Sequence, residues 1–324
     1  MTTKRRDLVS LIERGAIPPE QVALATEVVG LHPGPRAWAL LIDRLLLWLG
    51  GLALAFGVLF FVAYNWAEMG RLSRFGLVQA ALLMAVGIVL WGRASTMLVR
   101  VALTAAFLLV GVLLALFGQV YQTGADPWQL FFLWAVLVLP WVWVARFDVL
   151  WVAWLGLLNL AVWLYASTWG GGILGTMFTA SDAVLWGIVC INITAQVVWE
   201  WGAQQRDWPG RWAICLLALG GGVPMTLLMM EWVTGESYVF APIMVAYPVW
   251  LAALYGVYRH WRLELFMLAG GCVSVITVVT LLLVRHVFWG SWHAESLLLL
   301  AGAVFGMGAL AVAWLKRLNA EVAP

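Results

Sequence analysis

The chain has few charged residues. Only 10% of its 324 residues are Asp, Glu, Lys or Arg, against roughly 25% in an average soluble domain. Two lysines, Lys4 and Lys316, are present, and the formal net charge at pH 7 is +2. Nucleic-acid-binding proteins carry a strongly basic surface, and a net charge this small does not indicate one. We therefore expect no nucleic-acid partner.

Residues that hold metals or form disulfides are also scarce. The three cysteines, Cys190, Cys215 and Cys272, fall inside apolar runs and form no close pair, so we interpret them as small buried side chains. Among the four histidines, His286 and His293 stand seven residues apart, a spacing that would suit a pair of metal ligands on one helix. We prefer the interpretation that this segment is an interfacial loop. We expect no metal and no cofactor.

Common enzyme motifs are missing as well. The sequence has no Gly-rich phosphate loop ending in Lys, no H-E-x-x-H and no G-x-S-x-G. The glycine-rich stretch "TWGGGILG", residues 168–175, lies between apolar runs and reads as a turn. The sequence favours a protein that is not an enzyme.

Apolar residues, in contrast, are abundant. They make up 64% of the chain, with 23 tryptophans and a mean hydropathy of +0.96. Helices are the economical way to cross a bilayer, because unpaired backbone groups in lipid cost several kcal/mol each. The pattern predicts an all-α, polytopic transmembrane helical bundle. The fourth and fifth spans are separated by "RFD" alone, so the alternatives there are a count of nine or a tight helical hairpin. We expect about ten spans, approximately Leu45–Tyr64, Phe75–Trp91, Met97–Phe117, Trp128–Ala145, Val149–Ala166, Ala183–Trp199, Ala213–Met230, Val239–Tyr258, Leu265–Val284 and Ser296–Leu315.

The first 40 residues differ from the remainder. They contain two stretches with apolar residues on one helical face, separated by "GAIPPE", which combines a glycine stop with a proline start. No cleaved signal peptide is expected. We predict a short amphipathic helical hairpin over residues 1–40, docked on the first spans or on another copy of the chain, then membrane regions over residues 41–145 and 146–324.

Basic residues predict the orientation. With the N-terminus inside and ten spans, the outer segments contain Arg71, Arg74 and Arg285, while the other basic residues among the 18 fall inside. Cytoplasmic segments carry the excess of Lys and Arg. We expect both termini in the cytoplasm.

Arg71 and Arg74 are therefore exceptions, placed together on the predicted outer face. They can pair with Glu68 or with Asp126 of the next outer loop, or they can contact an anionic group such as a lipid phosphate. The next outer loop, "FGQVYQTGADPWQ", adds more polar residues, with Gly124 for a turn and Asp126-Pro127 to start the following helix. The predicted binding cluster comprises Asn65, Trp66, Arg71, Arg74, Gln119, Tyr121, Gln122 and Asp126.

These segments resemble a known family. A "G-x-I-x-x-E-Q" lead, then "FVAYNW", an arginine-bearing loop and "GQVYQTGADPWQLFFLWAVLVLP" are similar to the bacterial integral membrane family called domain of unknown function 2157. The resemblance covers about Asp7–Ala145. It implies a location in the bacterial inner membrane and no particular activity.

Polar residues inside the spans give a second hypothesis. Asn192 and Gln196 lie one turn apart on a single helical face, as interhelical hydrogen-bonding groups or as part of a substrate path. "LALGGGVPM" places three glycines and a proline inside the seventh span. It predicts either a break, like those that line the binding sites of many transporters, or a kink where helices pack closely. No carboxylate lies clearly at mid-depth, which argues against a proton-coupled carrier. The predicted path comprises Asn192, Gln196, Gly221 and Pro224.

The sequence thus leaves two main functions open, and an enzyme acting on lipid-linked substrates is least favoured because Asp126 is a single carboxylate. The first is a non-enzymatic membrane protein whose outer cluster binds a lipid head group or a protein of the envelope or membrane. The second is a transporter of a small or amphipathic solute. We also expect membrane lipids as partners and leave open a homo-oligomer.

Overall fold

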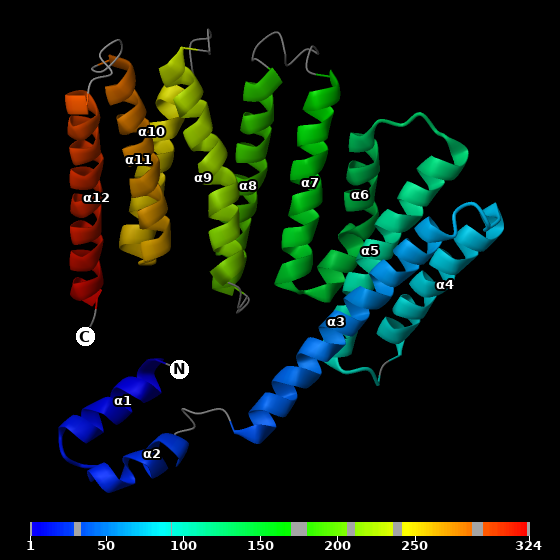
Figure 1. Cartoon of the computed structure of the whole chain (residues 1–324), viewed down its shortest axis with the longest axis horizontal. Coiled ribbons are helices and arrows are strands. Elements are labelled where there is room, and N and C mark those ends of the chain that lie inside the picture. The colour runs from blue at the N-terminus through cyan, green and yellow to red at the C-terminus, as the bar shows by residue number, and fades with distance from the viewer. Residues whose placement is uncertain are drawn as a thin grey trace. The chain divides into compact units, whose positions relative to one another are not determined.

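A computed structural model shows the chain as a set of α-helices (Figure 1). It describes residues 2–28, 34–91, 93–169, 180–205, 211–235, 242–286 and 294–322. The helices form two compact units, Met1–Leu116 and Phe117–Pro324. All assigned elements in the described residues are helical, as the sequence predicts.

The first unit begins with a helical hairpin. Helix α1, Thr2–Glu13, is followed by Gly15 in the left-handed region, where a residue without Cβ is unstrained. A 3₁₀ turn, η1 (Pro19–Gln21), then leads into α2, Val22–Val28. The predicted glycine stop and proline start are both confirmed. Leu8 is buried, while Leu24 and Val28 remain exposed.

Three long apolar helices complete this unit. They are α3 (Pro35–Tyr64), α4 (Arg71–Leu90) and α5 (Thr96–Tyr121), whose last turn passes into the second unit. Helix α3 starts ten residues before the predicted span, because Pro35 is well suited to a first helical turn and no breaker follows it. Gly51 of α3 faces Val101 of α5 so closely that a Cβ there would overlap the valine.

The second unit continues with a tight helical hairpin. Helices α6 (Pro127–Ala145) and α7 (Asp148–Trp169) are joined by Arg146 and Phe147, and Arg146 adopts a left-handed conformation, φ 44°. The indole of Trp154 on α7 donates a hydrogen bond to the carbonyl of Ala135 on α6, at 2.8 Å. The fourth and fifth predicted spans are therefore two separate helices.

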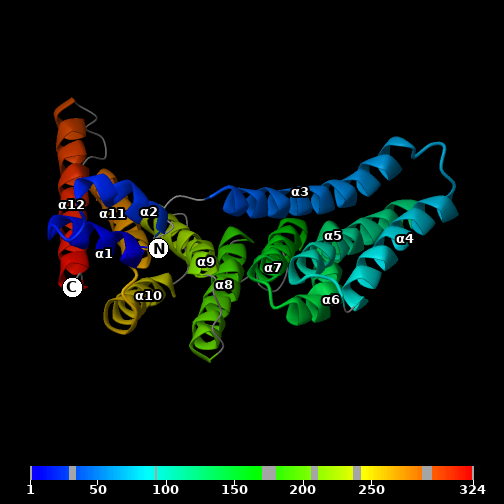
Figure 2. The ribbon, with the colours of Figure 1, turned by 90° about the horizontal axis from the view of Figure 1, so that it is seen from below.

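The remaining helices of the second unit stand largely in one row. Helices α8 (Ala180–Gln205), α9 (Arg211–Thr234), α11 (Leu265–His286) and α12 (Ala294–Val322) follow α7 side by side (Figure 1). Helix α10, Ile243–Gly256, lies beside this row and packs on α9 and α11 (Figure 2). It covers one side of the layer.

Helix α10 ends in a different kind of turn. It has 14 residues, and the five residues Val257–Trp261 that continue it form a π-helical turn, called η3 here. The π turn widens the helix so that the backbone N–H of Arg262 bonds to the carbonyl of Val257, at 3.1 Å. The predicted start of this span, Val239, lies outside the described residues.

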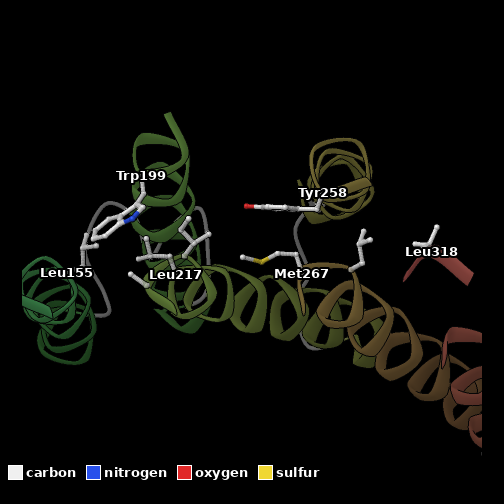
Figure 3. Close-up of a cluster of buried hydrophobic side chains, with 9 residues drawn as sticks. Leu155, Trp199, Leu217, Tyr258, Met267 and Leu318 are labelled. Atoms are coloured by element: carbon white, nitrogen blue, oxygen red, sulfur yellow. The ribbon is translucent and has the colours of Figure 1, made fainter. Parts of the chain in front are cut away.

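An apolar cluster holds the second unit together near the π turn. Figure 3 shows Leu155 of α7, Trp199 of α8, Leu217 of α9, Tyr258 of η3, Met267 of α11 and Leu318 of α12, all buried. Each of these elements contributes at least one side chain, so the cluster joins segments far apart in the sequence. In Figure 3 the tyrosine hydroxyl points toward α8.

Nine helices in the described part of the chain are long and apolar enough to cross a membrane. They match nine of the ten predicted spans, and α10 with η3 occupies the position of the remaining one, the eighth. The fold class predicted from the sequence, an all-α polytopic bundle with a short N-terminal hairpin, is confirmed.

Candidate functional site

The α3–α4 connection carries half of the predicted binding cluster. Asn65 ends α3 and donates a hydrogen bond from Nδ2 to the carbonyl of Phe61, at 2.9 Å. Trp66 follows it, and Gly70 occupies the N-cap position of α4 without a side-chain cap. The residues that the sequence placed together here are therefore at one helix–loop–helix junction.

Arg74 is held by Trp66. Its guanidinium carbon lies 3.8 Å from the centroid of the indole ring, and its Nη2 donates to the backbone carbonyl of Trp66. A cation over an aromatic face gains about 0.5–1 kcal/mol at an exposed site. The Nε atom of Arg74 is buried and has no hydrogen-bond partner. Arg74 thus shapes the junction and is bound within it.

Arg71 is arranged differently. It is the first residue of α4, its side chain is exposed, and within the described residues it forms no ion pair. Neither arginine pairs with Glu68, so that predicted contact is wrong: Arg74 prefers the indole face, while Arg71 and Glu68 both extend into solvent. Because the first backbone N–H groups of a helix lack intrahelical partners, Arg71 lies beside further unpaired donors.

The other half of the cluster lies around the end of α5. Gln119 and Tyr121 are exposed in its last turn, and the Tyr121 ring lies 4.8 Å from that of Phe117. Gln122 and Gly124 have positive φ, 45° and 63°, which confirms the predicted turn.

Asp126 and Pro127 take the N-cap and first positions of α6, as predicted. The Asp126 side chain makes no capping hydrogen bond, however, so the cap depends on backbone geometry and on the proline. Asn65, Trp66, Arg71 and Arg74 belong to the first unit and Gln119, Tyr121, Gln122 and Asp126 to the second. A single patch made of all eight residues remains a prediction.

The predicted break in the seventh span is wrong. Helix α9 is continuous from Arg211 to Thr234, with Pro224 buried inside it. The glycines allow close packing instead: a Cβ on Gly221 would lie 3.2 Å from Ile193 of α8, and one on Gly222 would lie 3.2 Å from Trp250 of α10. The glycine run therefore serves helix contact and leaves the α9 hydrogen-bond ladder largely in place.

Asn192 is hydrogen-bonded between helices. It is 5% exposed, and its Nδ2 donates to Oδ1 of Asn159 on α7, at 2.7 Å, and to the carbonyl of Ile188, at 2.9 Å. Asn159 in turn donates to the carbonyl of Leu155, at 2.8 Å. These contacts correspond to the interhelical alternative that the sequence left open.

Gln196, one turn further along α8, reaches a partner that the sequence analysis missed. Its Nε2 donates to the hydroxyl of Tyr258, at 2.8 Å, and that hydroxyl donates to Oε1 of Glu200, at 3.0 Å. Oε2 of Glu200 accepts from Nη1 of Arg262, at 3.2 Å. Asn192, Gln196 and Glu200 are spaced four residues apart, and this spacing was the available signal for a polar stripe along α8.

A separate set of hydrogen-bonded hydroxyl groups lies between α9, α10 and α11. Ser274 of α11 is 2.7 Å from the hydroxyl of Thr226 and 2.7 Å from that of Tyr247. In an apolar surrounding these groups satisfy one another. The described residues contain no cluster of metal-ligating side chains.

The long apolar helices and their internally paired polar groups define a multi-pass membrane protein. Residues 10–151 match the model of a family described as a predicted membrane protein, domain of unknown function 2157. This match confirms the resemblance seen in the sequence. Searches of curated proteins and of solved structures find no match.

Proposed function

We propose that this protein is a non-enzymatic inner-membrane protein that binds an anionic lipid head group at its α3–α4 junction. In this proposal both termini face the cytoplasm and the junction faces the periplasm, as the distribution of basic residues indicates. The observation that carries the proposal is Arg71, an exposed guanidinium without an ion-pair partner in the described residues.

The chemistry of the junction suits a phosphate. A guanidinium offers a fork of N–H donors that matches two phosphate oxygens, and the start of α4 adds backbone donors and the positive end of the helix dipole. The N-cap, Gly70, supplies no side-chain group that would compete for those donors. The phosphate would contact Arg71 at the edge of the apolar run that begins with Phe75.

Arg74 and Trp66 support this site without occupying it. Their contact fixes the loop one turn from Arg71, and an indole at this level prefers the boundary between acyl chains and water. A lipid head group would therefore meet a junction that is already ordered.

The transport hypothesis gains less support. Its polar groups, Asn192 and Gln196, are already hydrogen-bonded, and α9 runs unbroken past Gly221 and Pro224. A transported solute would have to displace these contacts first.

Native mass spectrometry of the detergent-extracted protein tests the proposal, with phosphatidylglycerol as the added lipid. We expect Arg71→Gln to weaken lipid retention about tenfold, the effect of losing one hydrogen bond to a charged group. Arg93→Gln is the matched control, because Arg93 is an exposed arginine just beyond the opposite end of α4. It should leave retention unchanged.

Two results would contradict the proposal. Equal retention by wild type and Arg71→Gln would exclude the arginine from lipid binding. Equal loss in both variants would show a general charge effect. Co-purification of an envelope protein that Arg71→Gln releases, with lipid retention intact, would replace the lipid by a protein partner.

A further inference from the structure

The π turn η3 is tied to α8 by charged groups. Glu200 directs both of its carboxylate oxygens at this short segment, Oε1 toward the Tyr258 hydroxyl at 3.0 Å and Oε2 toward Arg262 at 3.2 Å. The side chains of Glu200 and Arg262 are 17% and 36% exposed, so the pair lies at the edge of the helix layer. Hydrogen bonds to a charged group are stronger than those between neutral groups.

Tyr258 carries this contact into the interior. The residue is 3% exposed, and its ring packs in the cluster with Trp199, Leu217 and Met267 (Figure 3). Its hydroxyl also accepts a hydrogen bond from Gln196. One side chain therefore connects a polar edge to an apolar core.

The segment that carries Tyr258 has features of a movable element. Helix α10 lies outside the row of helices, contains Pro248 and ends in the π turn, a conformation frequent at functional sites. Proline removes a backbone hydrogen bond inside a helix. At the η3 end, the side-chain contacts to α8 add to the backbone hydrogen bonds of the π turn.

We propose that Glu200, Tyr258 and Arg262 form a latch that holds α10–η3 against α8, and that its release opens this end of the second unit to water. The inference goes beyond lipid binding at Arg71 and does not depend on it. By the predicted orientation the latch faces the cytoplasm, the side opposite the proposed lipid site.

Neighbouring ion pairs show why this contact differs from ordinary surface charge. Arg259, on the same turn, binds Glu321 of α12 at 2.6 Å, but Glu321 is 56% exposed. Arg211 of α9 pairs with Glu264, and Arg211 is 66% exposed. Exposed pairs of this kind contribute little. Of these pairs, the one at Glu200 adjoins the buried cluster through Tyr258.

A native cysteine reports on the latch. Cys215 of α9 is partly buried and packs against the Tyr258 cluster, whereas Cys272 of α11 is partly buried outside it. Two proteins, one with Cys190 and Cys272 replaced by Ala and one with Cys190 and Cys215 replaced by Ala, each keep a single thiol. The rate of labelling by a water-soluble maleimide in lipid nanodiscs then measures local opening.

We expect Glu200→Gln and Arg262→Gln to speed labelling of Cys215 about tenfold, the effect of losing a charged hydrogen bond on a local opening equilibrium. Tyr258→Phe, which keeps the ring but removes the hydroxyl, should also speed labelling of Cys215. Arg259→Gln is the matched control on the same turn and should change the rate by less than about twofold. Labelling of Cys272 should stay constant in every variant.

The charge-exchanged variant Glu200→Arg with Arg262→Glu should restore slow labelling of Cys215. Unchanged Cys215 labelling in the single variants would overturn the proposal. Faster labelling of Cys215 and Cys272 together would also overturn it, because it would show general loosening of the fold.

Discussion

Oδ1 of Asn192 lies 2.6 Å from the position that a Cβ atom on Gly220 would occupy. Helices α8 and α9 therefore approach each other at a point where a glycine meets a side chain that also bonds to α7. Small residues allow such close approach in membranes, where helix association depends on packing and hydrogen bonds. Gly220 and Asn192 therefore form a single close contact between α9 and α8.

Gly220→Ala should destabilise the protein. The added methyl group must displace the Asn192 amide, and a forced shift of this size in a packed interior costs about 1–3 kcal/mol. Chemical unfolding in detergent micelles measures the change. Gly270→Ala, at a glycine of α11 with open space around it, is the control and should be neutral or slightly stabilising, by up to about 1 kcal/mol.

Removing the amide should relieve the clash. We expect Gly220→Ala to cost less in an Asn192→Ala background than in the wild type, because the methyl group then has room. If the two costs are equal, the contact does not limit the approach of the helices.

The Asn159–Asn192 hydrogen bond should contribute about 0.6 kcal/mol, the average for polar contacts between membrane helices. A double-mutant cycle with Asn159→Ala and Asn192→Ala isolates this coupling from the packing each variant loses. Zero coupling would mean that each amide is satisfied by its own helix carbonyl, at Leu155 and Ile188.

Trp66→Leu should release Arg74. We expect the free energy of unfolding to fall by about 1 kcal/mol, while Trp66→Phe, which keeps an aromatic face, should lose less. Trp201→Leu, at an exposed tryptophan of α8, controls for the loss of an indole. A loss with Trp201→Leu equal to that with Trp66→Leu would contradict a specific stacking contribution.

Labelling of single introduced cysteines should show which side of the membrane each loop faces. In a cysteine-free background, Thr123→Cys in the α5–α6 turn should react with an impermeant reagent added to intact spheroplasts, and Arg93→Cys should react after lysis. Both positions are exposed, so burial does not limit labelling. Labelling of position 123 from the interior alone would reverse the proposed orientation.

The spans were predictable because apolar run length is a local property. A stretch such as residues 97–117 must form a helix wherever it lies in lipid, since it has no other way to pair its backbone. The stop at Gly15 and the turn at Gly124 were predictable for a similar reason, because both depend on the conformations open to glycine at that position.

The contacts between spans were not predictable in the same way. Tyr258 and Gln196 are 62 residues apart, and neither the π turn nor the position of α10 beside the row is visible in the pattern of apolar residues. The glycines at 220–222 show the difficulty. Three glycines and a proline lower helix propensity, but close packing against α8 and α10 keeps α9 continuous.

The two-residue connection between α6 and α7 bears on how the protein is made. From Ala145 to Asp148 the connection makes three Cα–Cα steps and spans about 11 Å at most, close to the diameter of one helix, about 10 Å. With so short a connection, α6 and α7 stay directly beside each other in lipid. We therefore expect the pair to enter the membrane together during synthesis, and a longer linker would remove that constraint.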